Sequence, residues 1–92
     1  MNVYIVILQS AEKGSVQYYI DEIKLFSNFD DAKTYAKHMP KKISEIFNIS
    51  EDKIKISEKD YPEKEEFTIH ANFQHEDRER NSWAIVQKKE VE

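Results

Sequence analysis

The chain has 92 residues, with 18 acidic and 14 basic side chains, a formal net charge of −4 and no cysteine. The lack of cysteine excludes disulfides, thiolate metal sites and a cysteine nucleophile, and it is typical of cytoplasmic proteins. The negative charge argues against nonspecific attraction to nucleic acid. A chain of this length fits a single domain, expected over residues 1–92 with a frayed tail at 88–92.

The N-terminal segment carries a nearly continuous apolar run within Val3–Gln9. This pattern predicts a central strand covered on both faces. The run is too short to span a bilayer and lacks the positive flank and cleavage site of a signal peptide, so we expect no membrane association. Gly14, the only glycine, predicts a turn that uses its positive φ.

The next segment, VQYYIDEIKLF, is rich in residues that favour strands. Its apolar positions change phase, so that one face of a regular strand cannot hold all of them: Val16, Tyr18, Ile20, Ile23 and Leu25. The change falls at Asp21 and Glu22, where it predicts a bulge or a bend.

A helix is predicted from FSNFDDAKTYAKHM, with Ser27 or Asn28 as its cap and two aspartates in its first turn. A buried stripe recurs at helical spacing and consists of Phe29, Ala32, Ala36 and Met39. Pro40 predicts either a kink at Met39 or a stop and a restart. Asn48 is a reasonable end for the second part.

Three further strands are expected, in KIKIS, EFTIHANF and SWAIVQKK. In the first, Ile54 and Ile56 should point inward, and the following EKDYPEKE reads as a polar connection. QHEDRERN reads as a charged hairpin turn. The expected fold is therefore α+β: a mostly antiparallel sheet of about five strands, in the order β-β-α-β-β-β, with the helical segment packed on one face.

The sequence offers little for catalysis. A minimal zinc set could use His70, His75 and one carboxylate, but their placement on a strand face and in a connection argues against it. The acidic pairs are sequence neighbours, which point to opposite faces when they lie on a strand, so they cannot share a proton: Asp21 with Glu22, Asp30 with Asp31, Glu51 with Asp52, Glu65 with Glu66. Glycine-rich loops and serine nucleophile signatures are missing. We expect a non-enzymatic protein without catalytic residues, metal or cofactor.

Aromatic and basic residues are interleaved twice, as expected of single-strand nucleic-acid binders: Tyr18, Tyr19 and Lys24, and later Arg78, Arg80 and Trp83. Because the net charge is negative, we expect no direct binding of nucleic acid. Acids are more prominent, and if they converge in space they could occupy a basic cleft that evolved for phosphates. The expected partner-binding acids, each a surrogate for a phosphate, are Glu51, Asp52, Glu58, Asp60, Glu63, Glu65, Glu66, Glu76, Asp77 and Glu79. The competing interpretation is a solvated surface of mixed charge.

The pattern Phe-Ser-x-x-x-x-Ala-x-x-Tyr-Ala, at residues 26–36, resembles small proteins of phages and low-GC bacteria. Length, acidic α+β build and composition also resemble the T4-type anti-restriction nuclease proteins, which are DNA mimics directed against a modification-dependent restriction enzyme. The resemblance implies a phage inhibitor of host defence, acting in the host cytoplasm on a DNA-binding protein with a basic cleft. The alternative is a structural or assembly domain, held to a partner or as a homodimer through a sheet edge or exposed aromatics such as Trp83 and Tyr61.

Overall fold

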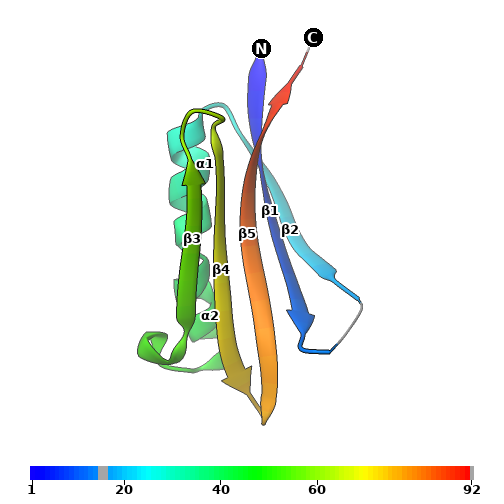
Figure 1. Ribbon diagram of the computed structural model, residues 1–92, viewed down its shortest axis with the longest axis vertical. Helices are drawn as coiled ribbons and strands as arrows, with labels where there is room; N and C mark the ends of the chain where they lie inside the picture. Colours follow the sequence, from blue (N-terminus) through cyan, green and yellow to red (C-terminus); the bar gives the residue numbers. More distant parts are fainter. Residues whose placement is uncertain (15–16, 92) are drawn as a thin grey trace.

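The computed structural model describes residues 1–14 and 17–91. It contains one antiparallel sheet with a bent helical segment packed on one side (Figure 1). The elements are β1 (Asn2–Glu12), β2 (Tyr19–Phe26), α1 (Phe29–Lys37), α2 (Met39–Phe47), a short 3-10 helix η1 (Glu51–Lys53), β3 (Lys55–Tyr61), β4 (Glu66–His75) and β5 (Arg78–Glu90). The strand order is β2-β1-β5-β4-β3, and the predicted α+β architecture is confirmed. The predicted strand position Val16 lies outside the described residues.

The centre of the sheet is the pair β1 and β5, which runs from Asn2 opposite Glu90 to Glu12 opposite Arg80. β5 therefore continues as paired strand into the segment that was expected to fray. Beyond it, the backbone N–H of Val91 donates to the carbonyl of Met1 over 2.8 Å. Pairing satisfies these backbone groups in spite of the polar side chains around them.

The predicted irregularity in β2 is a β-bulge. Leu8 of β1 lies opposite Glu22, whereas the next residue, Gln9, lies opposite Ile20. Asp21 is thus the extra residue, and the phase change in the apolar pattern is accounted for. As a result Ile20 and Ile23 both point to the side of the sheet away from the helices, beside Gln9 and Ile7.

The helical segment stops and restarts. The side chain of Asn28 accepts a hydrogen bond from the backbone N–H of Asp31 over 2.8 Å, which is the predicted cap. α1 ends at Lys37, and α2 begins at Met39 with Pro40 in its first turn, where its missing N–H costs nothing. Asn48 ends α2 in the left-handed conformation, with φ of 53°.

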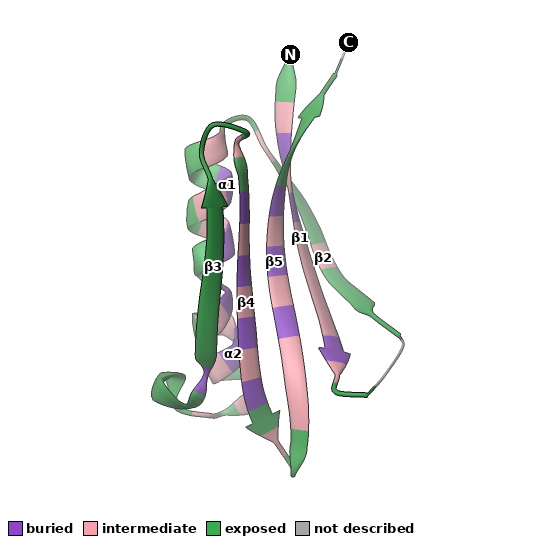
Figure 2. Cartoon of the chain, viewed as in Figure 1, coloured by how far each residue is buried: buried purple, intermediate pink, exposed green. Residues whose placement is uncertain are grey.

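The core lies between the helices and one face of the sheet (Figure 2). Small residues on both layers allow close approach: Ala32 and Ala36 of α1, Ala71 of β4 and Ala84 of β5 are fully buried. Larger side chains fill the space around them, namely Tyr4, Val6, Met39, Ile43, Ile54, Phe67, Ile69, Phe73 and Val86. The dense packing of such a core is what fixes the position of α1 on the sheet.

Four expectations are corrected. β1 is covered on the helix side only, so that Ile5 and Ile7 stay half-buried on the other side. β3 extends to Tyr61, because an edge strand whose residues are all exposed needs no apolar alternation. For the same reason Ile56 is 43% exposed, although it was expected to point into the core. His75 ends β4 and does not lie in the connection.

The charged turn is confirmed and is tighter than expected. His75 and Arg78 are a strand pair, so Glu76 and Asp77 alone form the connection. Both have positive φ, 53° and 62°. Two-residue hairpins with two positive φ values match the twist of the flanking strands, but they usually contain asparagine or glycine.

Candidate functional site

The ten predicted acids are spread along the molecule. Glu63, Glu65 and Glu66 lie at the turn between β3 and β4, whereas Glu76 and Asp77 lie at the opposite end of β4 (Figure 1). The ten-residue strand β4 separates the two groups by about 30 Å. The other acids are on η1 and on both sides of the sheet: Glu51 and Asp52, Glu58 and Asp60, and Glu79.

Three of these acids have partners within the chain. Asp60 forms an ion pair with Lys33 of α1. Glu65 accepts a hydrogen bond from the Tyr4 hydroxyl over 2.7 Å and pairs with Lys88 over 3.2 Å, and these two contacts hold its pKa below the usual value. The hydrogen bond raises the pKa of Tyr4 in turn. These acids contribute to the fold and are less free to meet an external cation.

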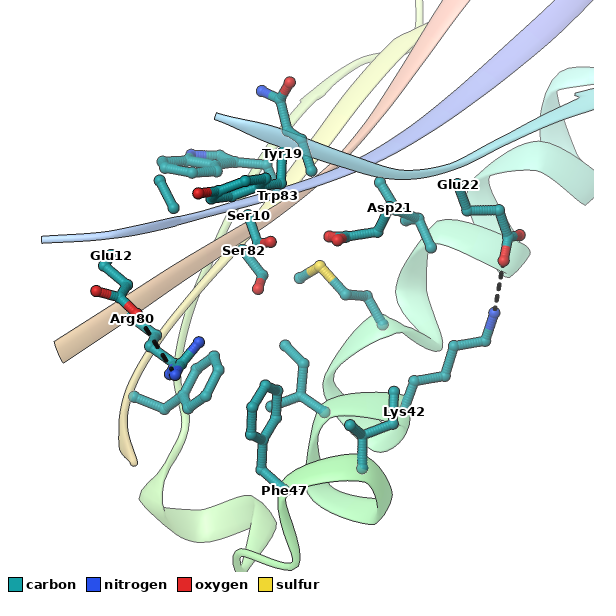
Figure 3. A pocket seen from close by; sticks show the side chains of 17 residues that line it. Ser10, Glu12, Tyr19, Asp21, Glu22, Lys42, Phe47, Arg80, Ser82 and Trp83 are labelled. Atoms are coloured by element: carbon teal, nitrogen blue, oxygen red, sulfur yellow. Dashed lines mark ion pairs between the residues drawn. The ribbon is translucent and has the colours of Figure 1, made fainter. Parts of the chain in front are cut away.

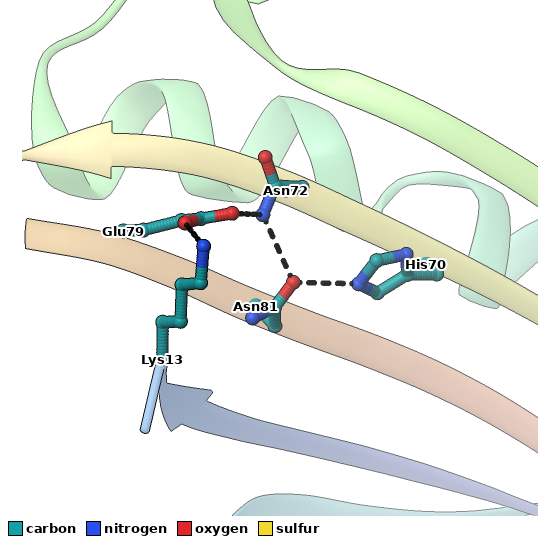
Figure 4. A network of polar contacts seen from close by, with 5 residues as sticks. All are labelled: Lys13, His70, Asn72, Glu79 and Asn81. Atoms are coloured by element: carbon teal, nitrogen blue, oxygen red, sulfur yellow. Dashed lines mark hydrogen bonds and ion pairs between the residues drawn. The ribbon is translucent and has the colours of Figure 1, made fainter. Parts of the chain in front are cut away.

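The third paired acid, Glu79, belongs to a polar network on the face of the sheet away from the helices (Figure 4). It pairs with Lys13 over 2.9 Å and accepts a hydrogen bond from Asn72, and both contacts lower its pKa. Asn72 also donates to Asn81, whose amide oxygen is 2.8 Å from Nε2 of His70. Hydrogen bonds and one ion pair thus join residues of β4 and β5 to Lys13, which directly follows β1.

The two histidines considered for a metal lie on opposite faces. They are five positions apart on one strand, and an odd separation reverses the side-chain direction. His70 stacks on Trp83, with ring centroids 5.1 Å apart and planes at 26°. His75 makes an edge contact with Phe47 of α2, with centroids 4.8 Å apart. Among the described residues, no three potential ligands gather to hold a metal ion.

The interleaved aromatic and basic residues also separate. Trp83 is on the face away from the helices, in contact with Tyr18 at 5.6 Å between ring centroids. Arg80 is on the helix side, with its guanidinium 5.3 Å from the centroid of Phe47. The indole of Trp83 and the guanidinium of Arg80 therefore lie on opposite faces of the sheet.

The face of the sheet away from the helices, here called the open face, carries an apolar patch. Strand register places Ile23, Ile7 and Ile85 in one row and Leu25 with Ile5 in the next, while Ile20 begins a third row that leads to Trp83. The patch is defined as Ile5, Ile7, Ile20, Ile23, Leu25 and Ile85. Three of its members on β2 remain largely exposed: Ile20 by 62%, Ile23 by 59% and Leu25 by 63%.

The helix side contains a cavity of about 390 Å³ between α2 and the ends of β1, β2 and β5 (Figure 3). Its floor includes Ser10 and Ser82, which lie opposite each other in the sheet. These small side chains leave room below α2, whereas α1 packs directly on β1 and β5. The helical wall is mostly apolar, formed by Met39, Ile43, Ile46 and Phe47, with Lys42 beside them.

Two acidic neighbours, Asp21 and Glu22, both line this cavity. The sequence rule that adjacent strand residues point to opposite faces fails here because Asp21 is the extra residue of the bulge. The bulge was predicted from the sequence, but the two carboxylates were expected on opposite faces. The phase change of the apolar residues was the signal that could have placed them together.

Comparisons with known proteins add no assignment. No protein-family model matches the chain, and no match was found among curated proteins or among solved structures. No helix in the described ranges, 1–14 and 17–91, is long and apolar enough to cross a membrane. The functional interpretation therefore depends on the two surfaces described above, the apolar patch and the cavity.

Proposed function

We propose that this protein is a non-enzymatic assembly protein that binds a second copy of itself through the apolar patch. The observation that carries the proposal is the exposure of Ile20, Ile23 and Leu25, at 59–63%, on one side of the edge strand β2. Large contiguous apolar patches on soluble domains mark interaction sites. Single exposed aliphatic residues are common, but three that adjoin a further half-buried row are not.

The charge distribution supports a copy of the same chain as the partner. Within the patch all six side chains are aliphatic. The ionised residues of the open face lie toward its margins, as Lys55 and Lys59 of β3 and the Lys13–Glu79 pair do. Because the patch carries no charge, two copies can bring their patches together without like-charge repulsion. In a two-fold symmetric dimer the same patch is used on both copies, so the chain needs no second, complementary surface.

The expected affinity follows from the exposed fractions. Burying the remaining 60% or so of each of the three side chains is worth roughly 1–2 kcal/mol. Two-fold symmetry counts each side chain twice and gives roughly 6–12 kcal/mol for the dimer. This is of the same order as the 4–15 kcal/mol or so lost as rotational and translational freedom. Ile5, Ile7 and Ile85 add a further gain, and the dimer should dissociate in roughly the micromolar to millimolar range.

Sedimentation equilibrium over concentrations from roughly micromolar to millimolar tests the proposal. The wild-type protein should dimerise, and Ile23→Lys should remain monomeric at every concentration. Ile56→Lys is the matched control, because Ile56 is 43% exposed on an edge strand but points to the helix side. Circular dichroism checks that both variants fold. A wild-type protein that stays monomeric throughout, or an equal loss in both variants, would contradict the proposal.

A second candidate function is the acidic mimic of DNA. Its support is that seven of the ten acids form no ion pair with a described residue, since only Asp60, Glu65 and Glu79 do. On β3, Glu58 and Asp60 also point to one side while Lys55 and Lys59 point to the other. Such a surface would compete with duplex DNA for a modification-dependent restriction enzyme. The competition should fall steeply with salt, whereas dimerisation through the apolar patch should not.

Substitutions that reverse or introduce charge distinguish the two candidate functions. The variant Glu51→Lys with Glu58→Lys and Glu63→Lys should abolish competition with DNA and leave the dimer intact if mimicry operates. The variant Ile23→Lys should do the reverse. Inhibition of the restriction enzyme that persists in the triple variant would exclude the mimic.

A further inference from the structure

The cavity below α2 has the size and composition of a small-molecule site, independently of the apolar patch. Its volume of about 390 Å³ falls near the lower end of the range of about 300–1,000 Å³ for ligand pockets. Such pockets are mostly apolar with a few convergent polar groups. Met39, Ile43 and Phe47 supply the apolar wall here, and Ile46 is 75% exposed beside them.

The bulge determines which polar groups reach this cavity. In a regular strand, one of the neighbours Asp21 and Glu22 would point to the open face. Since Asp21 is the extra residue, both side chains lie on the cavity, and Figure 3 shows the carboxylate of Asp21 pointing into it. Bulges are used in this way next to functional sites, where they redirect a side chain.

Of the two carboxylates, Asp21 is the one free to meet a ligand. Glu22 accepts a hydrogen bond from the Tyr35 hydroxyl, and its other oxygen is 4.0 Å from Nζ of Lys42. Lys42 also donates to the hydroxyl of Tyr35 over 2.8 Å. Asp21 forms no ion pair with any residue in the described ranges.

The other ionised groups on the lining are also engaged. Arg80 is 3.6 Å from Glu12, which accepts a further contact from Arg78 over 3.0 Å. The guanidinium of Arg80 lies over Phe47, as noted above. In total the lining holds three carboxylates, of Glu12, Asp21 and Glu22, against two cations, of Lys42 and Arg80. The cavity thus has an excess of one negative charge, located at Asp21.

We propose that this cavity binds a small organic amine that places its ammonium group at Asp21 and its apolar body against Met39, Ile43 and Phe47. An ammonium donates three hydrogen bonds and would pair with the free carboxylate. The apolar part gains from burial against α2. An anionic ligand of the same shape would meet Asp21 as a like charge and bind less tightly.

The test uses three probes with the same eight-carbon tail and different heads: octylamine, 1-octanol and nonanoate. Binding to the wild-type protein is measured by titration calorimetry. Octylamine should bind most tightly and nonanoate least. Equal affinities, or tighter binding of nonanoate, would overturn the proposal, and this comparison does not depend on any variant folding.

Asp21→Asn locates the site. Because Asp21 is an exposed residue on an edge strand, the pairing is partly screened, and the variant should lose about three- to tenfold in octylamine affinity. Its affinity for 1-octanol should not change. The matched control is Glu45→Gln, an exposed acid on α2 outside the lining, which should bind octylamine like the wild type. An equal loss in both variants would show a general effect of net charge and refute the site.

Ile23→Lys separates this proposal from the assembly function. The substitution changes the open face and leaves the cavity lining intact. It should abolish dimerisation and keep the affinity for octylamine unchanged. If octylamine binding is lost together with the dimer, the amine binds to the apolar patch and the cavity proposal is overturned.

Discussion

The turn between β4 and β5 is expected to carry removable backbone strain. Glu76 and Asp77 both adopt the left-handed conformation, at φ of 53° and 62°. This conformation costs an ordinary L-residue roughly 1–2 kcal/mol, asparagine and aspartate less, and glycine least. Replacing the pair by the preferred residues, as Glu76→Asn with Asp77→Gly, should therefore stabilise the fold.

The size of the effect is the difference of two terms. Relief of the left-handed conformation contributes roughly 2 kcal/mol over the two positions. The greater freedom of glycine in the unfolded chain removes roughly 0.4–1 kcal/mol. The net gain in unfolding free energy is thus about 1 kcal/mol, which corresponds to a rise in Tm of about 4–8 °C for a domain of this size.

Urea and thermal unfolding measure this gain, and high salt screens the charges that the double variant removes. Glu63→Gly is the control, because Glu63 lies in the turn between β3 and β4 and its φ is not positive. That substitution should lower the unfolding free energy by about 0.5–1 kcal/mol, since glycine gains no conformational relief there. If the double variant unfolds at the same or a lower urea concentration than the wild type, the strain argument is refuted.

Three further predictions concern the contacts that hold the layers together. Glu65→Gln should lower the unfolding free energy near neutral pH. Its difference from the wild type should shrink as the pH falls, because a depressed pKa contributes stability only while the carboxylate is ionised. A difference that stays constant in urea unfolding from pH 7 to pH 3 would refute this. Asn28→Ala removes the cap of α1 and should cost about 1 kcal/mol of unfolding free energy, whereas Ser27→Ala should cost little, since Asn28 is the residue that bonds Asp31. Phe67→Ala leaves a cavity at a side chain that is 1% exposed and should cost roughly 3–5 kcal/mol in urea unfolding, and a loss below about 1 kcal/mol would mean that the core can collapse around it.

Local chemistry accounts for the parts of the fold that the sequence predicted. The cap at Asn28, the restart at Pro40 and the stop at Asn48 each depend on one residue and its near neighbours. The bulge was also visible, because its signal is a change of phase within a few residues of one strand. Such features need no knowledge of the rest of the chain.

The surfaces were not predictable in the same way. Exposure of Ile23 and Leu25 depends on which side of the sheet the helices cover, which no local pattern encodes. The cavity depends on the distance of α2 from Ser10 and Ser82, and these three parts of the chain are far apart in the sequence. Asp21 and Glu22 both line that cavity because of the bulge and because α2 lies above it. The rule that adjacent strand residues point to opposite faces includes neither of these causes, so it predicted that the two carboxylates lie apart.

The contact between Val91 and Met1 brings the first and last described residues together beside the central strands (Figure 1). A short linker could therefore join them, and the chain could be reopened between Glu76 and Asp77 at the far end of the sheet. The rearranged polypeptide would keep every strand pair while converting the tightest turn into free ends. It would also move any fused tag or label from one pole of the molecule to the other.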